Sequence, residues 1–364
     1  MSRTVTVVGG GAIGLATAWR LAQRDARVTV VDPQPGHGAT DVAAGMLAPV
    51  TEVHYGEEPL LALNLDSARR WPAFAAELEA AAGMPVLYRS EGTLAAAVHD
   101  DDLRALDALV RFQTQLGLPV ERLRASACRE LEPALTPRIR GGAFVAGDHQ
   151  VEPRALTRAL QRACEDLGVE FVRQPVAAVT AGPRVRLEGG NDLTSEVVIV
   201  AAGCWSRALI DVPVRPVKGQ ILRLRGDVAA LLTRTIRGLA EGVSIYLVPR
   251  ASGELVLGAT VEERGFDDVV TAGAVRELLD AAAQLLPGVA ELELAEARAG
   301  LRPGTPDNAP ILGPAPGLDN VLLATGHFRN GILLTPITAD TIAELAATGE
   351  PAPVIAPFSA ARFR

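Results

Sequence analysis

The hydrophobic positions near the start of the chain form two short β-branched runs with an Ala- and Leu-rich stretch between them. The runs cover residues 5–8 and 28–31, and the stretch from 13 to about 23 has the pattern of a helix. A Gly-rich turn joins the first run to the helix, and Asp32 ends the second run. The pattern therefore predicts a strand, a helix and a second strand, the β-α-β unit of dinucleotide-binding proteins.

Three glycines of that turn, Gly9, Gly11 and Gly14, follow the spacing G-x-G-x-x-G. The first permits a tight turn, the second lets the backbone approach a pyrophosphate, and the third lets helix and strand pack closely. The helix N-terminus, at Ala12 and Ile13, offers free N–H groups and a partial positive charge to phosphates. The carboxylate that ends the second run can accept hydrogen bonds from ribose hydroxyls. This fingerprint does not distinguish NAD from FAD, and a Gly-rich turn in an ordinary α/β protein is the alternative.

Beyond residue 32, the hydrophobic pattern alternates between two kinds of organisation. Continuous apolar strands over 196–202 and 321–324 are typical of a parallel sheet buried on both faces. Antiparallel strands are indicated by the runs over 217–224, 243–249 and 254–259. Helices are expected over 60–82 with a break near Pro72, 100–117, 153–167, 269–286 and 332–347. A further short helix near residue 40 could be capped by Thr40 or Asp41.

These patterns predict an α/β protein with a Rossmann-like dinucleotide-binding domain and a second, mixed antiparallel-sheet α+β domain. The first domain is expected to be discontinuous and to comprise residues 1–52, 148–210 and 300–364. The second domain, which would bind the substrate, is expected to comprise residues 53–147 and 211–299. Two domains also agree with a chain of 364 residues.

Composition and charge narrow the classes of function. A hydrophobic content of 48% and a charged content of 21% are ordinary for a globular protein, and a net charge of −8 argues against a nucleic-acid partner. Cys128, Cys164 and Cys204 are widely spaced and odd in number, which fits a reducing compartment and argues against disulfides or a zinc site. The five histidines lack ligand spacing, so no metal is expected. No signal peptide is visible and no apolar run reaches about 18 residues, which predicts a cytoplasmic protein without a membrane span.

Four motifs, spread over the whole chain, carry a resemblance to a known family. They are the glycine fingerprint, GATDVAAGMLAP (38–49), AAGCWS (201–206), and GLRPGTPDNAPILGP (300–314) with GHFRNGILLTP (326–336). Together they resemble the FAD-dependent amine oxidases of the D-amino-acid oxidase and sarcosine oxidase superfamily, and within it the glycine oxidases of thiamine biosynthesis. The resemblance implies FAD rather than NAD. No cysteine follows Cys204 to form a thioether, so the FAD is expected to be non-covalent, and the family's habit predicts a homo-oligomer such as a tetramer.

The resemblance also implies which residues contact the cofactor. The loop over 38–49 would pack on the isoalloxazine and the pyrophosphate, although a plain connecting loop is the alternative. Val176 would pair with adenine through its backbone, and Gly203 would let the chain pass close to the cofactor. Residues 331–335 would begin the last helix, whose N–H groups would stabilise negative charge on the reduced flavin. The remaining expected contacts are Thr40, Ala43, Gly45, Met46, Leu47, His327, Arg329, Asn330, Gly331, Ile332 and Leu333.

An amino-acid substrate keeps its carboxylate, so its site needs a forked cation that binds this group bidentately and fixes the direction of the Cα–H. By resemblance this cation is Arg302, although a solvated surface arginine is the alternative. Alternation places Ser244, Tyr246 and Val248 on one sheet face. The Tyr246 hydroxyl would add a second hydrogen bond to the carboxylate, with a core tyrosine as the alternative. Arg329 would line the active-site entrance or the flavin face.

The implied reaction is the oxidative deamination of glycine, and of small amines or D-amino acids, by hydride transfer from the neutral amine to the flavin. Oxygen would be reduced to hydrogen peroxide, and the imine would hydrolyse to glyoxylate and ammonia or serve thiazole formation. A sarcosine or D-amino-acid oxidase, or a dehydrogenase that passes electrons to a quinone, is an alternative within the superfamily. A NAD-dependent dehydrogenase and an inactive FAD-binding subunit are alternatives from other classes.

Overall fold

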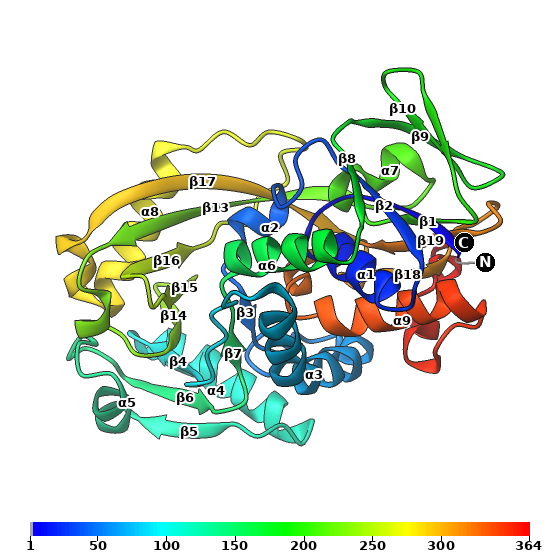
Figure 1. The fold of residues 1–364 in the computed structure, drawn as a ribbon. Coiled ribbons are helices and arrows are strands. Elements are labelled where there is room, and N and C mark those ends of the chain that lie inside the picture. The colour runs from blue at the N-terminus through cyan, green and yellow to red at the C-terminus, as the bar shows by residue number, and fades with distance from the viewer. Residues whose placement is uncertain (1–2) are drawn as a thin grey trace.

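The computed structural model describes residues 3–364 and contains two large sheets that lie next to each other (Figure 1). The first sheet has six strands in the order β18-β19-β12-β1-β2-β8. Its neighbouring strands run parallel except β18 and β19, which are antiparallel. The bounds are β1 Thr4–Val8, β2 Arg27–Val31, β8 Glu170–Val172, β12 Val197–Val200, β18 Ile311–Pro314 and β19 Val321–Thr325.

Both faces of the first sheet are covered, which explains the continuous apolar character of its strands. One face packs in a single apolar cluster with four helices, α1 Ala12–Ala22, α3 Glu58–Ala82, α6 Pro153–Asp166 and α9 Thr335–Thr348. The other face packs against a three-stranded meander and a short helix, β9 Val176–Thr180, β10 Arg184–Leu187, β11 Asp192–Thr194 and α7 Ser206–Leu209. Figure 1 shows the β9–β10 hairpin projecting from this side of the molecule.

The second sheet has eight strands in the order β17-β13-β16-β15-β14-β4-β6-β5. Its bounds are β4 Thr93–Ala97, β5 Glu121–Arg124, β6 Gly141–Val145, β13 Arg215–Arg225, β14 Thr235–Ala240, β15 Val243–Pro249, β16 Glu254–Gly258 and β17 Glu293–Gly304. One face packs against the helices α5 Ala125–Leu131 and α8 Ala272–Leu285. The opposite face of its central strands packs against the short helix α2 Ala39–Val42, through Val42 and Val248. The two sheets therefore meet around the loop that follows β2.

The remaining elements are α4 Asp100–Gln115, which packs on β4 and β6, and a two-stranded pair formed by β3 Met46–Leu47 and β7 His149–Gln150. Within residues 3–364, no helix is both long enough and apolar enough to cross a bilayer. The predicted α/β architecture, with a parallel nucleotide-binding sheet and a mixed second sheet, is confirmed.

One local expectation was wrong because tertiary contacts outweighed a local signal. Helix α3 runs through Pro72 without a break, because the flanking Trp71 and Phe74 are fully buried and their packing offsets the missing N–H. The last helix begins at Thr335, within the start expected over 331–335 but three residues after 332, and it follows a turn in which the Leu334 N–H donates to the Asn330 carbonyl. Strand β14 was not expected at all.

The short helix near residue 40 forms, but neither proposed cap acts as one. Its N-cap is Gly38, and Thr40 and Asp41 lie inside the helix. The Thr40 hydroxyl instead accepts a hydrogen bond from the Ala12 N–H, at 3.2 Å. A side chain expected to cap its own helix therefore satisfies the first turn of α1, the helix of the glycine fingerprint.

The packing of α3 and of residues 300–304 differs from the expected domain boundaries. Helix α3, which falls in the stretch assigned to the second domain, buries Leu63, Trp71 and Leu78 in the cluster of the first sheet. Strand β17 pairs with β13 as far as Gly304, so residues 300–304 belong to the second sheet. We therefore propose that the first domain extends to about residue 86 and resumes at residue 305 after β17. The other expected boundaries stay predictions.

Candidate functional site

A cavity of about 1050 Å³ lies between the two sheets and brings together most of the residues that the sequence singled out. They come from the ends of first-sheet strands, from the loop over 38–49, from the second sheet and from the turn before α9. The expected residues in its lining are Gly9, Gly11, Ala12, Ile13, Asp32, Thr40, Ala43, Gly45, Met46, Val176, Gly203, Tyr246, Arg302, His327, Arg329, Asn330, Gly331 and Ile332.

Three expected site residues lie outside this lining. Gly14 packs against the first turn, because a Cβ there would lie 1.9 Å from the Gly9 carbonyl oxygen. The Leu47 side chain is buried in the core, whereas the neighbouring Met46 lines the cavity, as alternation in β3 requires. Leu333 is also buried in the core, and its carbonyl accepts hydrogen bonds from α3 at 2.6 and 2.8 Å. The helix–strand role expected for Gly14 fits its position, whereas the structure places Leu47 and Leu333 among core residues.

At one end of the cavity, the turn over residues 9–14 adopts a backbone conformation that requires glycine. Gly9 has a φ of +110°, and a Cβ there would lie 2.3 Å from the Ala201 carbonyl oxygen. The Asp32 carboxylate accepts the N–H groups of Gly10 and Gln34, both at 2.7 Å, which fixes its position at the end of β2. The Ile13 N–H has no acceptor among residues 3–364 and is available to an anion in the cavity.

The turn before α9 offers a second set of N–H donors. Gly331 and Ile332 line the cavity, and their N–H groups meet no acceptor within the described part of the chain. His327 is buried, and burial lowers its pKa to about 3, so it is neutral at physiological pH. Its Nε2 lies 3.1 Å from the Thr338 hydroxyl, which holds the ring in place. The turn therefore presents backbone donors beside an uncharged side chain.

A row of residues crosses the face of the second sheet that lines the cavity. Arg302 on β17, Gly219 on β13, Gly258 on β16, Tyr246 on β15 and Arg237 on β14 occupy neighbouring strands. Strand register puts Tyr246 directly opposite Gly258 on one side and Arg237 on the other. Arg302 pairs with Val217, which alternation puts on the same face of β13 as Gly219 and as Ile221, the partner of Gly258. Since paired residues share a face, the aromatic ring and both guanidinium groups project from the same side of the sheet.

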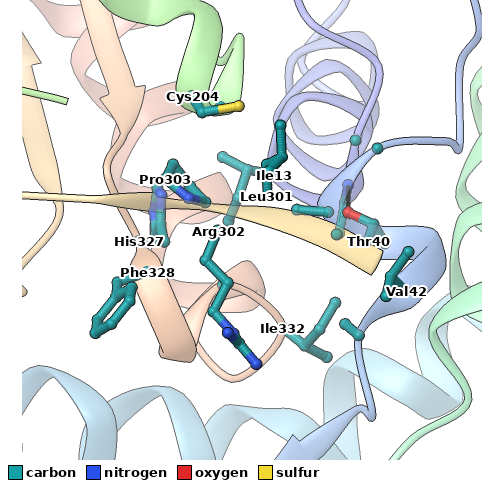
Figure 2. A pocket seen from close by; sticks show the side chains of 18 of the residues that line it. Ile13, Thr40, Val42, Cys204, Leu301, Arg302, Pro303, His327, Phe328 and Ile332 are labelled. Atoms are coloured by element: carbon teal, nitrogen blue, oxygen red, sulfur yellow. Dashed lines mark hydrogen bonds between the residues drawn. The ribbon is translucent and has the colours of Figure 1, made fainter. Parts of the chain in front are cut away.

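The two glycines in that row make room for the long side chains beside them. A Cβ on Gly219 would lie 2.2 Å from Arg302 Nη1, and a Cβ on Gly258 would lie 2.2 Å from the Tyr246 hydroxyl oxygen. Arg302 and Tyr246 therefore lie across a glycine floor, where no other residue leaves the same space. Figure 2 shows the Arg302 side chain leaving β17 with its guanidinium group directed toward Ile332.

Arg302 is a partly buried cation, and it has no anionic partner among residues 3–364. Its Nη1 donates to the backbone carbonyls of Thr260 at 3.1 Å and Lys218 at 3.4 Å. Among residues 3–364, no carboxylate forms an ion pair with it, and burial lowers its pKa from the usual value. Burial raises the pKa of Tyr246, and the nearby charge of Arg302 partly offsets this effect. A buried charge without a counterion is costly, so this end of the cavity favours an anionic ligand with a forked acceptor.

A charged cluster in the same cavity was missed by the sequence analysis. Arg237 and Arg329 both form ion pairs with Glu52, and Arg329 also pairs with Glu57 at 2.7 Å. Arg329 was expected near the entrance, but Arg237 and Glu52 carry no recognisable motif. Arg237 lies on β14, the strand that the hydrophobic pattern did not reveal, so no local signal indicated its side chain.

A nucleotide-binding turn that faces a sheet with a partly buried arginine, unpaired within residues 3–364, is the arrangement of a dinucleotide-dependent oxidoreductase acting on an anionic substrate. Comparison with known proteins specifies the family. The model of the FAD dependent oxidoreductase family (DAO) matches residues 4–345, and the chain belongs to this family. The predicted FAD-dependent amine oxidoreductase, with FAD as its cofactor, is confirmed.

The relatives cover nearly the whole chain. The glycine oxidase of Geobacillus kaustophilus is 34% identical over 98% of this chain and 96% of its own. The crystal structure of that enzyme superposes with a TM-score of 0.90 at 33% identity, covering 98% of both chains. The iminodiacetate oxidase of Chelativorans sp. BNC1 gives a TM-score of 0.86 at 26% identity, also covering 98% of both chains. The bifunctional protein ThiO/ThiG of Trichormus variabilis is 34% identical over the full chain, which spans only 56% of that relative.

The cavity fits FAD by its own construction. Its volume suits a ligand larger than a simple metabolite, and it runs from Val176 near the meander to Arg302 on the second sheet. The open N–H of Ile13 suits the pyrophosphate, and those of Gly331 and Ile332 suit an anionic edge of the flavin ring. With the flavin between the two sheets, the guanidinium of Arg302 would face its substrate side.

Proposed function

We propose that this protein oxidises glycine, and less readily other small amines or D-amino acids, to imines in thiamine biosynthesis. The observation that carries the proposal is the partly buried Arg302 guanidinium, which pairs with no carboxylate of residues 3–364 and lies next to Tyr246 in the FAD cavity. The names of the relatives, glycine oxidase and ThiO/ThiG, support this choice of substrate and pathway. A sarcosine or D-amino-acid oxidase is the alternative.

Bound FAD supplies the hydride acceptor. Arg302 binds the substrate carboxylate bidentately, and the Tyr246 hydroxyl donates a further hydrogen bond, so that the Cα–H points away from the sheet toward the flavin. The N–H groups of Gly331 and Ile332 stabilise negative charge that develops on the flavin side of the cavity. No side-chain base is needed if the amine binds in its neutral form.

The electron acceptor in this proposal is molecular oxygen, which gives hydrogen peroxide, while the released imine hydrolyses to glyoxylate and ammonia. FAD is held without a covalent bond. The one cysteine in the cavity lining, within residues 3–364, is Cys204, and burial raises the pKa of its thiol to about 12, so it is not a thiolate nucleophile. A cytoplasmic location and a homo-oligomeric state stay predictions.

The proposal is tested by anaerobic mixing of the purified yellow protein with glycine, sarcosine, D-alanine and D-proline. We expect glycine to bleach the flavin absorbance fastest at equal concentration, because the smallest substrate fits without displacing the side chains that surround Arg302. If glycine leaves the spectrum unchanged while another amine bleaches it, the substrate assignment is wrong. An oxygen-electrode trace then separates an oxidase from a dehydrogenase.

The glycine floor gives a prediction that needs no change of charge. In Gly219→Ala, the new Cβ would lie 2.2 Å from Arg302 Nη1 and force the guanidinium to move. Overpacking of this kind costs about 1–3 kcal/mol, so KM for glycine should rise roughly 5- to 150-fold while FAD content stays unchanged. The matched control is Gly273→Ala on α8, where a Cβ meets no atom within 4 Å. Equal KM values for the two variants would show that the floor does not position Arg302.

A further inference from the structure

We propose that Arg237 and Arg329 form a second anion subsite in the cavity and that Glu52 closes it. Glu52 thereby restricts the protein to amino acids with a single carboxylate. This inference rests on the proposed function, in which Arg302 binds the carboxylate next to the oxidised carbon. A substrate with a second carboxylate on its nitrogen substituent, such as N-carboxymethylglycine, would need the two arginines that Glu52 occupies.

Contacts place Glu52 between the two arginines. Its carboxylate pairs with Arg237 Nη1 and lies 3.5 Å from Arg329 Nε. All three side chains line the cavity and are largely buried, with 11% of Glu52, 19% of Arg237 and 21% of Arg329 exposed. A carboxylate of the protein therefore holds the position and the ion-pair partners that a second carboxylate of a ligand would use.

The subsite lies next to the group that binds the first carboxylate. Arg237 is the cross-strand partner of Tyr246, and the Cβ atoms of such pairs lie about 4.5–5.5 Å apart. The strand order places Tyr246 on β15, between Arg237 on β14 and Arg302 on β17, and the charges of both arginines influence its hydroxyl. A ligand with carboxylates a few atoms apart can therefore reach from Arg302 to Arg237 across the same sheet face.

Charge counting shows why Glu52 would exclude a second carboxylate rather than accommodate it. Glu52 and Glu57 balance Arg237 and Arg329, which leaves Arg302 for one substrate carboxylate. Burial and the charge of Arg329 lower the pKa of Arg237 to about 10, so it stays protonated at neutral pH. A second substrate carboxylate would face the charge of Glu52, and such like-charge juxtaposition costs several kcal/mol.

The surrounding contacts keep the subsite in place when Glu52 loses its charge. Glu57 holds Arg329 at 2.7 Å and accepts the Asn308 amide at 2.8 Å. The loop that carries Glu52 is tied to the buried Asp148 through the Val50 and Thr51 N–H groups, at 3.1 and 2.7 Å. A neutral side chain at residue 52 should therefore unmask the two cations without moving the backbone.

The test uses two ligands that cannot be oxidised as amines, glycolate and diglycolate, which carry one and two carboxylates. Their dissociation constants are measured on the FAD-loaded enzyme by titration calorimetry and by perturbation of the flavin spectrum. In the wild-type protein we expect diglycolate to bind at least tenfold more weakly than glycolate. In Glu52→Gln, the dissociation constant of diglycolate should fall at least tenfold, while that of glycolate should change less than threefold.

Two further variants make the test specific. The double variant Glu52→Gln with Arg237→Gln should lose the increased affinity for diglycolate, because it removes one of the two unmasked cations. Glu58→Gln removes an exposed carboxylate at the start of α3, outside the cavity lining, and should change neither constant. FAD content and Tm identify a variant that does not fold, and Glu52→Ser then replaces Glu52→Gln.

The subsite is refuted if the wild-type protein binds diglycolate as tightly as glycolate, or if neutralising Glu52 tightens both ligands equally. Persistence of the diglycolate gain in the double variant would refute the role of Arg237. These binding results are separate from flavin reduction by glycine. Failure of the proposed function would therefore appear as an unreduced flavin, and failure of this inference as an unchanged ratio of dissociation constants.

Discussion

Arg302→Ala is expected to lower kcat/KM for glycine by about thirtyfold to several-thousandfold while FAD stays bound. The guanidinium lies partly buried in the cavity and pairs with no carboxylate of residues 3–364, so it takes no part in an ion-pair network of that part of the chain. Truncating one partner of a buried, hydrogen-bonded charge pair costs about 2–5 kcal/mol, which gives the stated range. Steady-state kinetics over a range of glycine concentrations, with the flavin spectrum as a measure of FAD content, checks the prediction.

A second variant at this position, Arg302→Lys, separates the effect of charge from that of geometry. Lysine keeps the positive charge but loses the planar fork, so it should recover part of the affinity without fixing the direction of the Cα–H. We therefore expect its KM to lie between those of the wild-type and alanine variants, with a kcat that stays low. An unchanged KM in Arg302→Ala would contradict the carboxylate role, and loss of FAD in that variant would indicate a structural role instead.

Gly11→Ala is expected to weaken FAD binding in a protein that still folds. Gly11 has a φ of −77°, which alanine adopts readily, and its Cβ would meet only the Thr40 hydroxyl, at 3.3 Å. The added methyl group would therefore occupy the cavity where the backbone is expected to approach the pyrophosphate. Overpacking at a contact costs about 1–3 kcal/mol, so FAD affinity should fall roughly 5- to 150-fold.

The matched variant at the third glycine should fail differently. In Gly14→Ala the Cβ would lie 1.9 Å from the Gly9 carbonyl oxygen, a backbone atom that cannot rotate away. The expected result is a Tm lower by about 2–10 °C, with FAD loss as a consequence of the damaged turn. Titration of the apoprotein with FAD, together with thermal unfolding without it, distinguishes the two variants. If Gly11→Ala melts early as well, its methyl group disturbs the fold and not only the cofactor site.

Much of the first sheet could be predicted because its determinants are local. The runs that become β1 and β2, the glycine turn and α1 are adjacent in the chain, and period and turn chemistry identify them. The same holds for α6, which Pro153 begins, and for β12, whose residues are all buried. Pro72 misled the prediction because the packing of Trp71 and Phe74, which keeps α3 whole, depends on distant helices.

The candidate site was predictable where motifs carry it. Arg302, Arg329 and the loop over 38–49 belong to motifs, so the family resemblance was enough to single them out, and the cavity brings them together in space. The resemblance did not distinguish the two faces of a short strand or of a helical turn. It therefore included Leu47 and Leu333, which lie in the core.

By itself, the sequence of this protein determined the nucleotide-binding turn, the α/β class and the FAD-dependent family, because these depend on neighbouring residues or on whole motifs. Only the tertiary structure decided that Arg302 lacks a carboxylate partner within residues 3–364, that Gly219 and Gly258 form the floor beneath its site, and that Glu52 lies between Arg237 and Arg329. The physical reason is that pairing across strands joins residues far apart in the chain. Whether a charge is paired depends on every segment packed around it, which no local pattern records.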